Sequence, residues 1–212
     1  HFKISLTLKQ QFEMKKWLIP VIIIAVIIFG LYSWGKGFNN TAVNLKETAT
    51  RSWGDVESSY QRRNDLIGNL VKTVQGAADF EKSTLKEVIE ARAKATSTTI
   101  DGSNLTPENM AQFQEAQNGL SGALSKLLLV VERYPELKAN QNFLELQSQL
   151  EGTENRINIS RNRFNEAVEP YNKHIKIFPN SLFAGLFNFE QMNYYKADAG
   201  SEKAPDVDFN FK

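Results

Sequence analysis

The feature that most constrains this chain is an uncharged apolar stretch from Trp17 to Gly35. A helix of about 20 apolar residues spans the roughly 30 Å hydrocarbon core of a bilayer. Trp17, Tyr32 and Trp34 lie near its two ends, where aromatic rings prefer the membrane interface. The stretch therefore predicts a transmembrane helix within an anchor segment at residues 15–36. The lipid bilayer is the first expected partner, through residues 17–35.

Two other classes of segment share this composition. A cleaved signal peptide has a shorter apolar region and a small-residue cleavage site, which the residues around Ser33 match poorly. A buried core helix fits a chain whose other apolar residues are less regularly spaced. The anchor is the interpretation that we carry forward.

The orientation of the anchor follows from its flanking basic residues. Lys15 and Lys16 precede the apolar stretch directly, whereas Lys36, Lys46 and Arg51 are spread along the far side. The positive-inside rule then favours a cytoplasmic N-terminus. It predicts a single-pass protein of the inner (cytoplasmic) membrane with the remainder of the chain on the exported side.

Composition excludes several kinds of chemistry. The chain has no cysteine, which rules out disulfides, thiolate metal sites and thiol nucleophiles. Its two histidines, His1 and His174, are too few for a multi-histidine zinc site. The 25 basic and 24 acidic residues nearly cancel and form no basic stripe, so nucleic acid is not an expected partner. The glycine-rich phosphate-binding motifs are absent from the sequence, and we expect no metal and no cofactor.

Beyond the anchor, apolar residues recur in alternating steps of four and three, which places them on one face of a helix that packs against other helices. One position of the first such seam is charged, Arg63. The first seam consists of Ala49, Trp53, Val56, Tyr60, Arg63, Ile67, Leu70, Val74 and Ala77. Two later seams consist of Phe113, Gln117, Leu120, Leu124, Leu127, Val131 and Tyr134, and of Phe143, Leu146, Leu150, Thr153, Ile157, Ser160, Phe164, Ala167 and Tyr171.

Turn and cap signals divide this region into separate helices. Thr96–Leu105 has the composition of a loop, and Thr106 followed by Pro107 is typical of a helix start. Pro135 marks the end of the next helix, and Pro170 predicts a kink or break in the last long one. Ser181–Phe189 reads as a short apolar segment of one or two helical turns packed on the end of the bundle.

The sequence thus predicts an all-α protein: an N-terminal transmembrane helix followed by an antiparallel bundle of long helices, similar to a four-helix bundle. We expect a glycine hinge at Gly35-Lys36-Gly37, a helical bundle at residues 37–195, and an extended or disordered tail at residues 196–212. Residues 1–14 form a leader that we expect to be disordered or to precede a natural start at Met14.

Several blocks of residues, in order from the anchor to the tail, resemble the LemA family of bacterial membrane proteins. The blocks are Tyr60–Val71, Glu90–Ala95, Glu132–Asn140 with Asn142–Leu144, Glu154–Ile157, Tyr171-Asn172, Phe178-Pro179 and Pro205–Phe209. The resemblance implies one transmembrane helix plus a four-helix bundle in the bacterial envelope, with no established activity or cofactor. It therefore supports the fold and offers no reaction.

Charged residues on or beside the seams are the best candidates for a functional site. A polar pocket between helices could use paired carboxylates for acid–base work or cation binding. The alternative, which we favour, is an internal network of salt bridges that fixes the register of the helices. The candidate interhelical polar network comprises Arg62, Arg63, Asp65, Glu90, Arg92, Glu132, Glu154, Arg156 and Arg161. We expect Arg63 to pair with Glu132 or Glu154.

Three classes of function remain. The first is an interaction or scaffolding module without catalysis, whose partners are further copies of the chain or other membrane proteins. The second is a hydrolase or metal-binding bundle that uses the interhelical carboxylates. The third is a membrane-remodelling helical protein, for which only Ser181–Phe189 offers a suitable apolar segment.

Overall fold

The structure is a computed structural model that describes residues 2–76 and 80–196, with side chains from residue 17 onward. The described residues form six helices and contain no β-strand. The expected all-α fold class is confirmed. The helices are α1 (Phe2–Gln75), α2 (Lys82–Ser97), α3 (Pro107–Val131), α4 (Pro135–Lys138), α5 (Gln141–Lys176) and α6 (Asn180–Leu186).

The chain divides into two compact units, which are described separately. The membrane-proximal unit comprises the residues up to Asn44 together with Lys173–Glu190. The bundle unit comprises the described residues of 45–172 together with residues 191–196. Helices α1 and α5 each contribute to both units.

In the membrane-proximal unit, α1 carries the apolar stretch identified in the sequence. It is long and apolar enough to cross a bilayer, and among the described helices it alone meets that criterion. The large apolar side chains from Trp17 to Trp34 are each about half exposed or more. So large an uncovered apolar surface is unfavourable in water and is expected of a helix in contact with lipid.

Two expectations about α1 need correction. The helix continues through Gly35 and Gly37, so the predicted glycine hinge is wrong. Each glycine weakens a helix by only about 1 kcal/mol, and the ring of Phe183 covers Gly35. The backbone of residues 2–14 is helical, because α1 begins at Phe2, and is not the disordered leader that was one of our two expectations. The other expectation, a natural start at Met14, stays a prediction. Residues 197–212 of the expected tail lie outside the described residues.

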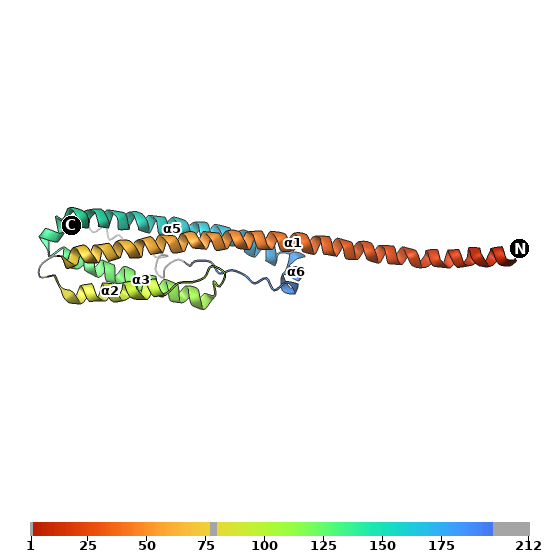
Figure 1. The fold of residues 1–212 in the computed structure, drawn as a ribbon, viewed down its shortest axis with the longest axis horizontal. Helices are drawn as coiled ribbons and strands as arrows, with labels where there is room; N and C mark the ends of the chain where they lie inside the picture. Colours follow the sequence, from red (N-terminus) through yellow and green to blue (C-terminus); the bar gives the residue numbers. More distant parts are fainter. Residues whose placement is uncertain (1, 77–79, 197–212) are drawn as a thin grey trace, which may run out of the picture. The chain divides into compact units, whose positions relative to one another are not determined.

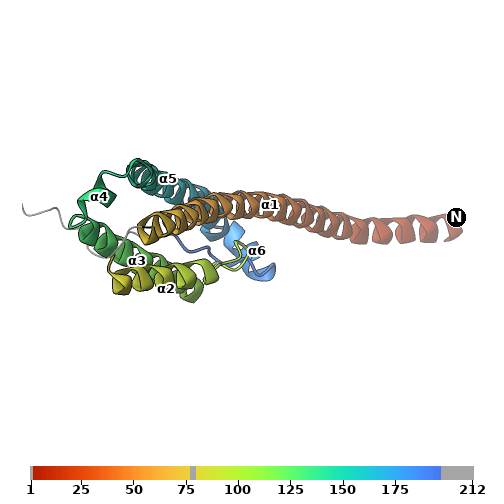
Figure 2. The same ribbon diagram turned by 60° about the vertical axis from the view of Figure 1, so that its left-hand side comes forward.

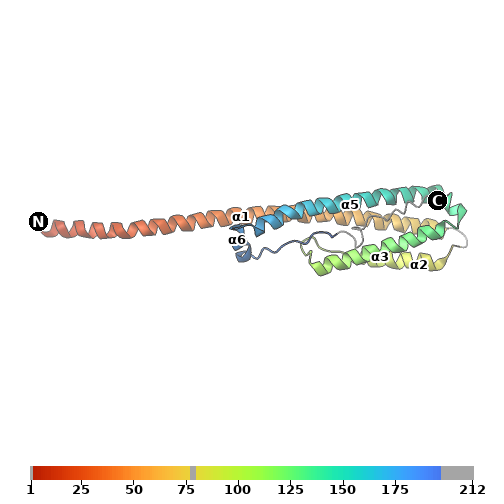
Figure 3. The ribbon, with the colours of Figure 1, turned by 180° about the vertical axis from the view of Figure 1, so that it is seen from behind.

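In the bundle unit, four helices lie side by side, each antiparallel to the one before it (Figures 1, 2 and 3). They are the second half of α1, then α2, α3 and α5 up to Asn172. The described part of the first seam, from Ala49 to Val74, is buried throughout, including Arg63, which is 3% exposed. Ala77, the last member of that seam, lies outside the described residues. The periodicity therefore identified the buried face of α1.

Aromatic rings hold the centre of the bundle unit together. The ring of Trp53 on α1 lies edge-on to Phe113 of α3 and to Phe164 of α5, with centroid distances of 5.5 and 5.2 Å. The Trp53 indole N–H also donates a hydrogen bond of 3.2 Å to the carbonyl oxygen of Ile100, in the loop between α2 and α3. A single buried side chain thus joins three helices and a loop.

The predicted helix boundaries are close to those observed. The hydroxyl of Thr106 accepts a hydrogen bond from the Asn109 N–H, as an N-cap should, and Pro107 occupies the first position of α3. Helix α5 continues through Pro170 to Lys176, so a break at this proline is wrong. Val168 and Tyr171 beside the proline are fully buried, and their packing holds this turn of the helix.

The last described residues of the bundle unit, 191–196, form an extended segment that we call the C-terminal strap. Two asparagines of α5 bind it, and each of them pairs with both backbone groups of one strap residue. The Asn172 side chain accepts from the Met192 N–H at 2.9 Å and donates to the Met192 carbonyl at 2.8 Å. Asn165 does the same with Tyr195 at 2.8 and 3.0 Å. The two amides thus replace the hydrogen bonds that a neighbouring strand would supply.

Candidate functional site: a cleft between helices α1, α3 and α5

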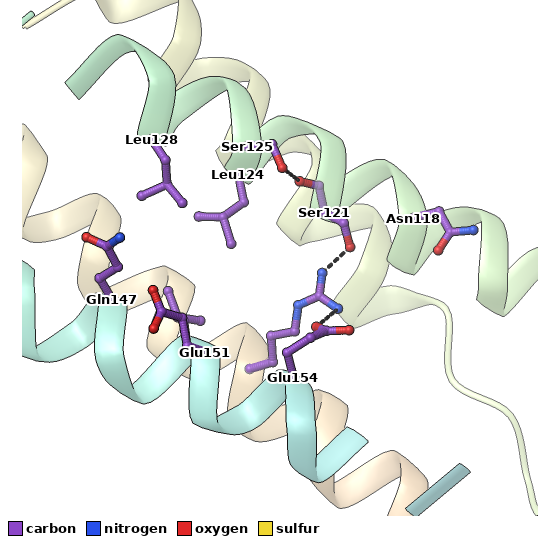
Figure 4. A pocket seen from close by; sticks show the side chains of 10 residues that line it. Asn118, Ser121, Leu124, Ser125, Leu128, Gln147, Glu151 and Glu154 are labelled. Carbon is purple, nitrogen blue, oxygen red and sulfur yellow. Dashed lines mark hydrogen bonds and ion pairs between the residues drawn. The ribbon is translucent and has the colours of Figure 1, made fainter. Parts of the chain in front are cut away.

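A cleft of about 530 Å³ opens on the bundle unit between α3 and α5, with α1 behind it. Leu124 and Leu128 of α3 and Leu150 of α5 give it an apolar wall. Its polar lining consists of Arg63, Asn118, Ser121, Ser125, Gln147, Glu151 and Glu154. Figure 4 shows the labelled side chains of α3 and α5 facing each other across the opening.

Arg63 is the buried cation of this cleft. Its guanidinium donates a hydrogen bond to the Ser121 hydroxyl of α3 and lies 3.4 Å from a carboxylate oxygen of Glu154 on α5 (Figure 4). The Ser121 hydroxyl in turn donates to the carbonyl oxygen of Gln117 at 3.0 Å. A guanidinium keeps its charge in proteins, so a buried arginine requires such partners. Of the two acids expected to pair with Arg63, the structure places Glu154 against it.

The open side of the cleft is acidic. The Glu154 side chain is 51% exposed although it faces the buried Arg63, and Glu151, one helical turn away, is also exposed. Arg63 offsets one of these two charges. The cleft therefore combines a leucine-lined wall with a surplus of negative charge at its mouth.

A second cross-helix contact joins α1 to α2 in the bundle unit. The Arg92 Nε donates to the backbone carbonyl of Asn64 at 2.7 Å, and its guanidinium lies 3.9 Å from the carboxylate of Asp65. Gly68 permits this approach, because a Cβ atom at that position would lie 3.1 Å from the Arg92 guanidinium. Arg92 and Asp65 are thus brought together, at a place separate from Arg63 and Glu154.

The remaining candidates do not join either pair. Glu90 pairs with Lys86 on its own helix at 3.7 Å, and Glu132 pairs with Lys138 of α4. Arg62 and Arg156 are exposed. The structure thus distributes the nine predicted residues over several local contacts and does not gather them in one pocket.

Arg161 takes part in a contact that sequence reasoning missed. Its guanidinium donates to the Tyr60 hydroxyl and lies 4.4 Å from the ring centre of Tyr195 in the strap. The hydroxyls of Tyr60 and Tyr195 are 2.8 Å apart. This contact ties the strap to α1 and α5. One feature of the sequence could have indicated that another segment binds here. Asn165 and Asn172 are seven residues apart, and each directly follows an aromatic residue of the seam.

The four acidic residues of the candidate network are held by basic groups. Asp65, Glu90, Glu132 and Glu154 each lie within 4 Å of an arginine or lysine nitrogen. Among the described residues, no group of three or more histidine, aspartate and glutamate side chains is arranged to hold a metal ion. Chemically, the arrangement can neutralise charges between helices and present the cleft as a binding surface.

An apolar helix able to cross a bilayer, joined to an antiparallel helical bundle, defines a class of membrane-associated helical proteins. Comparison with known proteins gives the family: residues 52–209 match the LemA family, and the chain belongs to it.

Three relatives illustrate the similarity. The chain is 26% identical over 174 residues to "Magnetosome protein MamQ 2" of Paramagnetospirillum magneticum, covering 74% of this chain and 64% of the relative. It is 25% identical over 173 residues to "Magnetosome protein MamQ" of Magnetospirillum gryphiswaldense, with the same coverage. It is 21% identical over 142 residues to "Protein LemA" of Metamycoplasma hominis, covering 67% and 61%. The chain thus spans less than two thirds of the length of these relatives, and their names denote no enzyme.

Proposed function

We propose that this protein is a membrane-anchored interaction module of the bacterial envelope without catalysis, and that the cleft between α3 and α5 receives an amphipathic helix of a partner protein. The observation that carries the proposal is the pairing of a leucine-lined wall with an acidic mouth in one cleft. An amphipathic helix binds such a groove through apolar side chains spaced at three and four residues. A basic residue on that helix would meet Glu151 and the exposed side of Glu154.

The surroundings of the acidic residues support a role without catalysis. A carboxylate used as a general acid or base needs a proton to exchange with a substrate and a pKa near the working pH. Here Glu154 faces a buried guanidinium, and Asp65 faces Arg92. Both acids are held as partners of arginines, a role in which they fix the positions of neighbouring helices.

Photocrosslinking from within the cleft tests the proposed partner. A photoreactive residue in place of Gln147 in native membranes should give a discrete adduct, because this side chain lines the cleft. The same residue in place of the exposed Arg62 is the control. Mass spectrometry of the adduct should identify a basic amphipathic helix of another protein. The additional change Glu151→Lys should remove most of the adduct, since like charges then face each other.

Other outcomes would contradict this proposal. An adduct of equal yield from both positions would show contact without use of the cleft. An adduct to a second copy of the chain would show that the cleft mediates self-association and does not bind a different protein. An adduct that survives Glu151→Lys would show that the negative charge at the mouth of the cleft does not attract the partner.

We also propose that the protein crosses the inner membrane once, with its N-terminus in the cytoplasm and the bundle unit on the exported side. The lysines that abut the apolar stretch support this orientation. An alkaline phosphatase fused after Lys212 should be active, because this enzyme matures only after export. A green fluorescent protein at the same position should stay dark. A silent phosphatase together with a bright fluorescent fusion would reverse the orientation.

A further inference from the structure

Helix α6 packs on the turn of α1 that directly follows the apolar stretch. In the membrane-proximal unit, the ring of Phe183 lies 6.1 Å from that of Trp34 and covers Gly35, where a Cβ atom would be 3.2 Å from the ring. Phe38, one turn further along α1, stacks on Phe183 and Phe187 at 5.9 and 6.3 Å. Figures 1 and 3 show α6 beside α1. Because Gly35 has no side chain, α6 can pack closely on α1 at this turn.

A histidine holds the chain that leads into α6. The ring of His174 stacks on Phe38 at 5.0 Å, and its Nε2 lies 3.2 Å from the Phe38 carbonyl oxygen. Because a carbonyl can only accept, Nε2 donates this hydrogen bond, which leaves Nδ1 to accept from the Asn180 amide at 3.3 Å. The position of α6 against α1 is therefore fixed by polar as well as aromatic contacts.

A second face of α6, next to the one that packs on α1, is apolar and exposed. Leu182 and Leu186 lie four residues apart in α6 and therefore share one face, and Phe178 lies in the turn that precedes the helix. The exposed fractions of Phe178, Leu182 and Leu186 are 80%, 66% and 72%. Ile177, which precedes them, is 48% exposed. Four large apolar side chains are thus uncovered in a segment of ten residues.

Basic residues flank this face. Lys173 and Lys176 precede it on α5, Lys36 lies on α1 beside Gly35, and all three are exposed. The sequence has no aspartate or glutamate between Glu169 and Glu190. A segment that is apolar on one side, with positive but no negative charges at its edge, is typical of helices that lie in the interface of an anionic membrane.

The height of α6 along α1 matches the membrane interface. Trp34 ends the apolar stretch, and Phe38 lies about 6 Å beyond it by the rise of an α-helix. The polar layer on each side of the hydrocarbon core is roughly 5–7 Å thick. The contacts of α6 with Trp34, Gly35 and Phe38 therefore place it within that layer when the apolar stretch spans the core.

We propose that α6, with Ile177 and Phe178, is a second membrane contact that inserts Phe178, Leu182 and Leu186 into the headgroup–acyl boundary of an anionic leaflet. The inference rests on the membrane anchor and goes beyond it, since it assigns a lipid-binding role to a segment far from the anchor in sequence. The packing of α6 beside the end of the apolar stretch and the neighbouring lysines favour lipid over a protein partner.

Site-specific labelling of the full-length chain tests the proposal. The chain contains no cysteine, so Leu182→Cys and Leu186→Cys each provide a single attachment point for an environment-sensitive NBD fluorophore. The control is Leu129→Cys on α3, because Leu129 is 73% exposed and Leu186 is 72% exposed. The proteins are placed in vesicles of phosphatidylcholine and phosphatidylglycerol at a ratio of about three to one, an anionic surface of the kind that attracts basic segments.

Labels at positions 182 and 186 should emit at shorter wavelength than the label at 129. They should lose most of their emission to lipids that carry a doxyl quencher near the headgroup, whereas aqueous iodide should quench only the label at 129. Lys173→Gln combined with Lys176→Gln should reduce the lipid quenching, and pure phosphatidylcholine should do the same. Iodide quenching of all three labels alike would overturn the proposal. Protection from iodide without doxyl quenching would also overturn it, in favour of a protein partner or a second copy of the chain.

Discussion

Replacing Asn172 by alanine is expected to destabilise the bundle unit by about 2–6 kcal/mol, because two buried backbone groups lose their partners and each such loss costs roughly 1–3 kcal/mol. Asn172 is 3% exposed, and its amide binds both the N–H and the carbonyl of Met192. Water cannot replace the amide while the strap stays docked. The strap must either keep two unsatisfied groups or detach and expose Met192 and Tyr195, which are 8% and 5% exposed.

The matched control is Asn162→Ala, on an exposed position of the same helix. Both substitutions exchange asparagine for alanine within α5, so the gain in helix propensity cancels between them. Urea unfolding of the full-length protein in detergent, followed by circular dichroism, measures the difference in the free energy of unfolding. Hydrogen exchange of the Met192 and Tyr195 amides should accelerate only in Asn172→Ala. If both variants unfold at the same urea concentration, the asparagine clamp contributes no stability.

The helical core could be predicted from the sequence because burial and periodicity are linked. A side chain repeated at alternating steps of four and three always returns to the same face of a helix, and that face is the one that packs. From Ala49 to Val74 the prediction holds at each position. Glycine and proline signals were weaker, since Gly35, Gly37 and Pro170 all lie inside continuous helices. Local propensity of about 1–3 kcal/mol is overridden where neighbouring side chains are well packed.

The candidate site was predictable only where a charge interrupted an apolar pattern. Arg63 stands in a seam, so its burial and its need for an acid followed from position alone. Ser121 and the cleft depend on which helices become neighbours and at what height, and one sequence does not specify that. Asn165 and Asn172 bind backbone groups of the strap. Because every residue type except proline carries both of these backbone groups, the amino-acid pattern of residues 191–196 does not indicate the contacts. Docking of α6 on Gly35 likewise depends on a contact between distant segments.

The second large effect concerns Arg63, whose replacement by alanine should destabilise the bundle unit by about 2 kcal/mol. Removing one partner of a fully buried ion pair costs about 3–5 kcal/mol. Here only Arg63 is buried, because the Glu154 side chain is 51% exposed and regains water when the arginine is lost. The remaining cost comes from the hydrogen bond to Ser121 and from the packing of the arginine stem between α1, α3 and α5.

Two further variants separate charge from packing. Arg63→Met keeps most of the side-chain volume and removes the buried charge, so its cost should lie well below that of Arg63→Ala. Glu154→Gln leaves a buried guanidinium with Ser121 as its neutral partner, so it should destabilise more than Arg63→Met although it alters a half-exposed residue. Arg62→Ala, one residue away and exposed, should change stability by less than about 0.5 kcal/mol. Urea unfolding of all four variants ranks their free energies of unfolding. Equal stability of Arg62→Ala and Arg63→Ala would mean that the buried cation does not hold the three helices together.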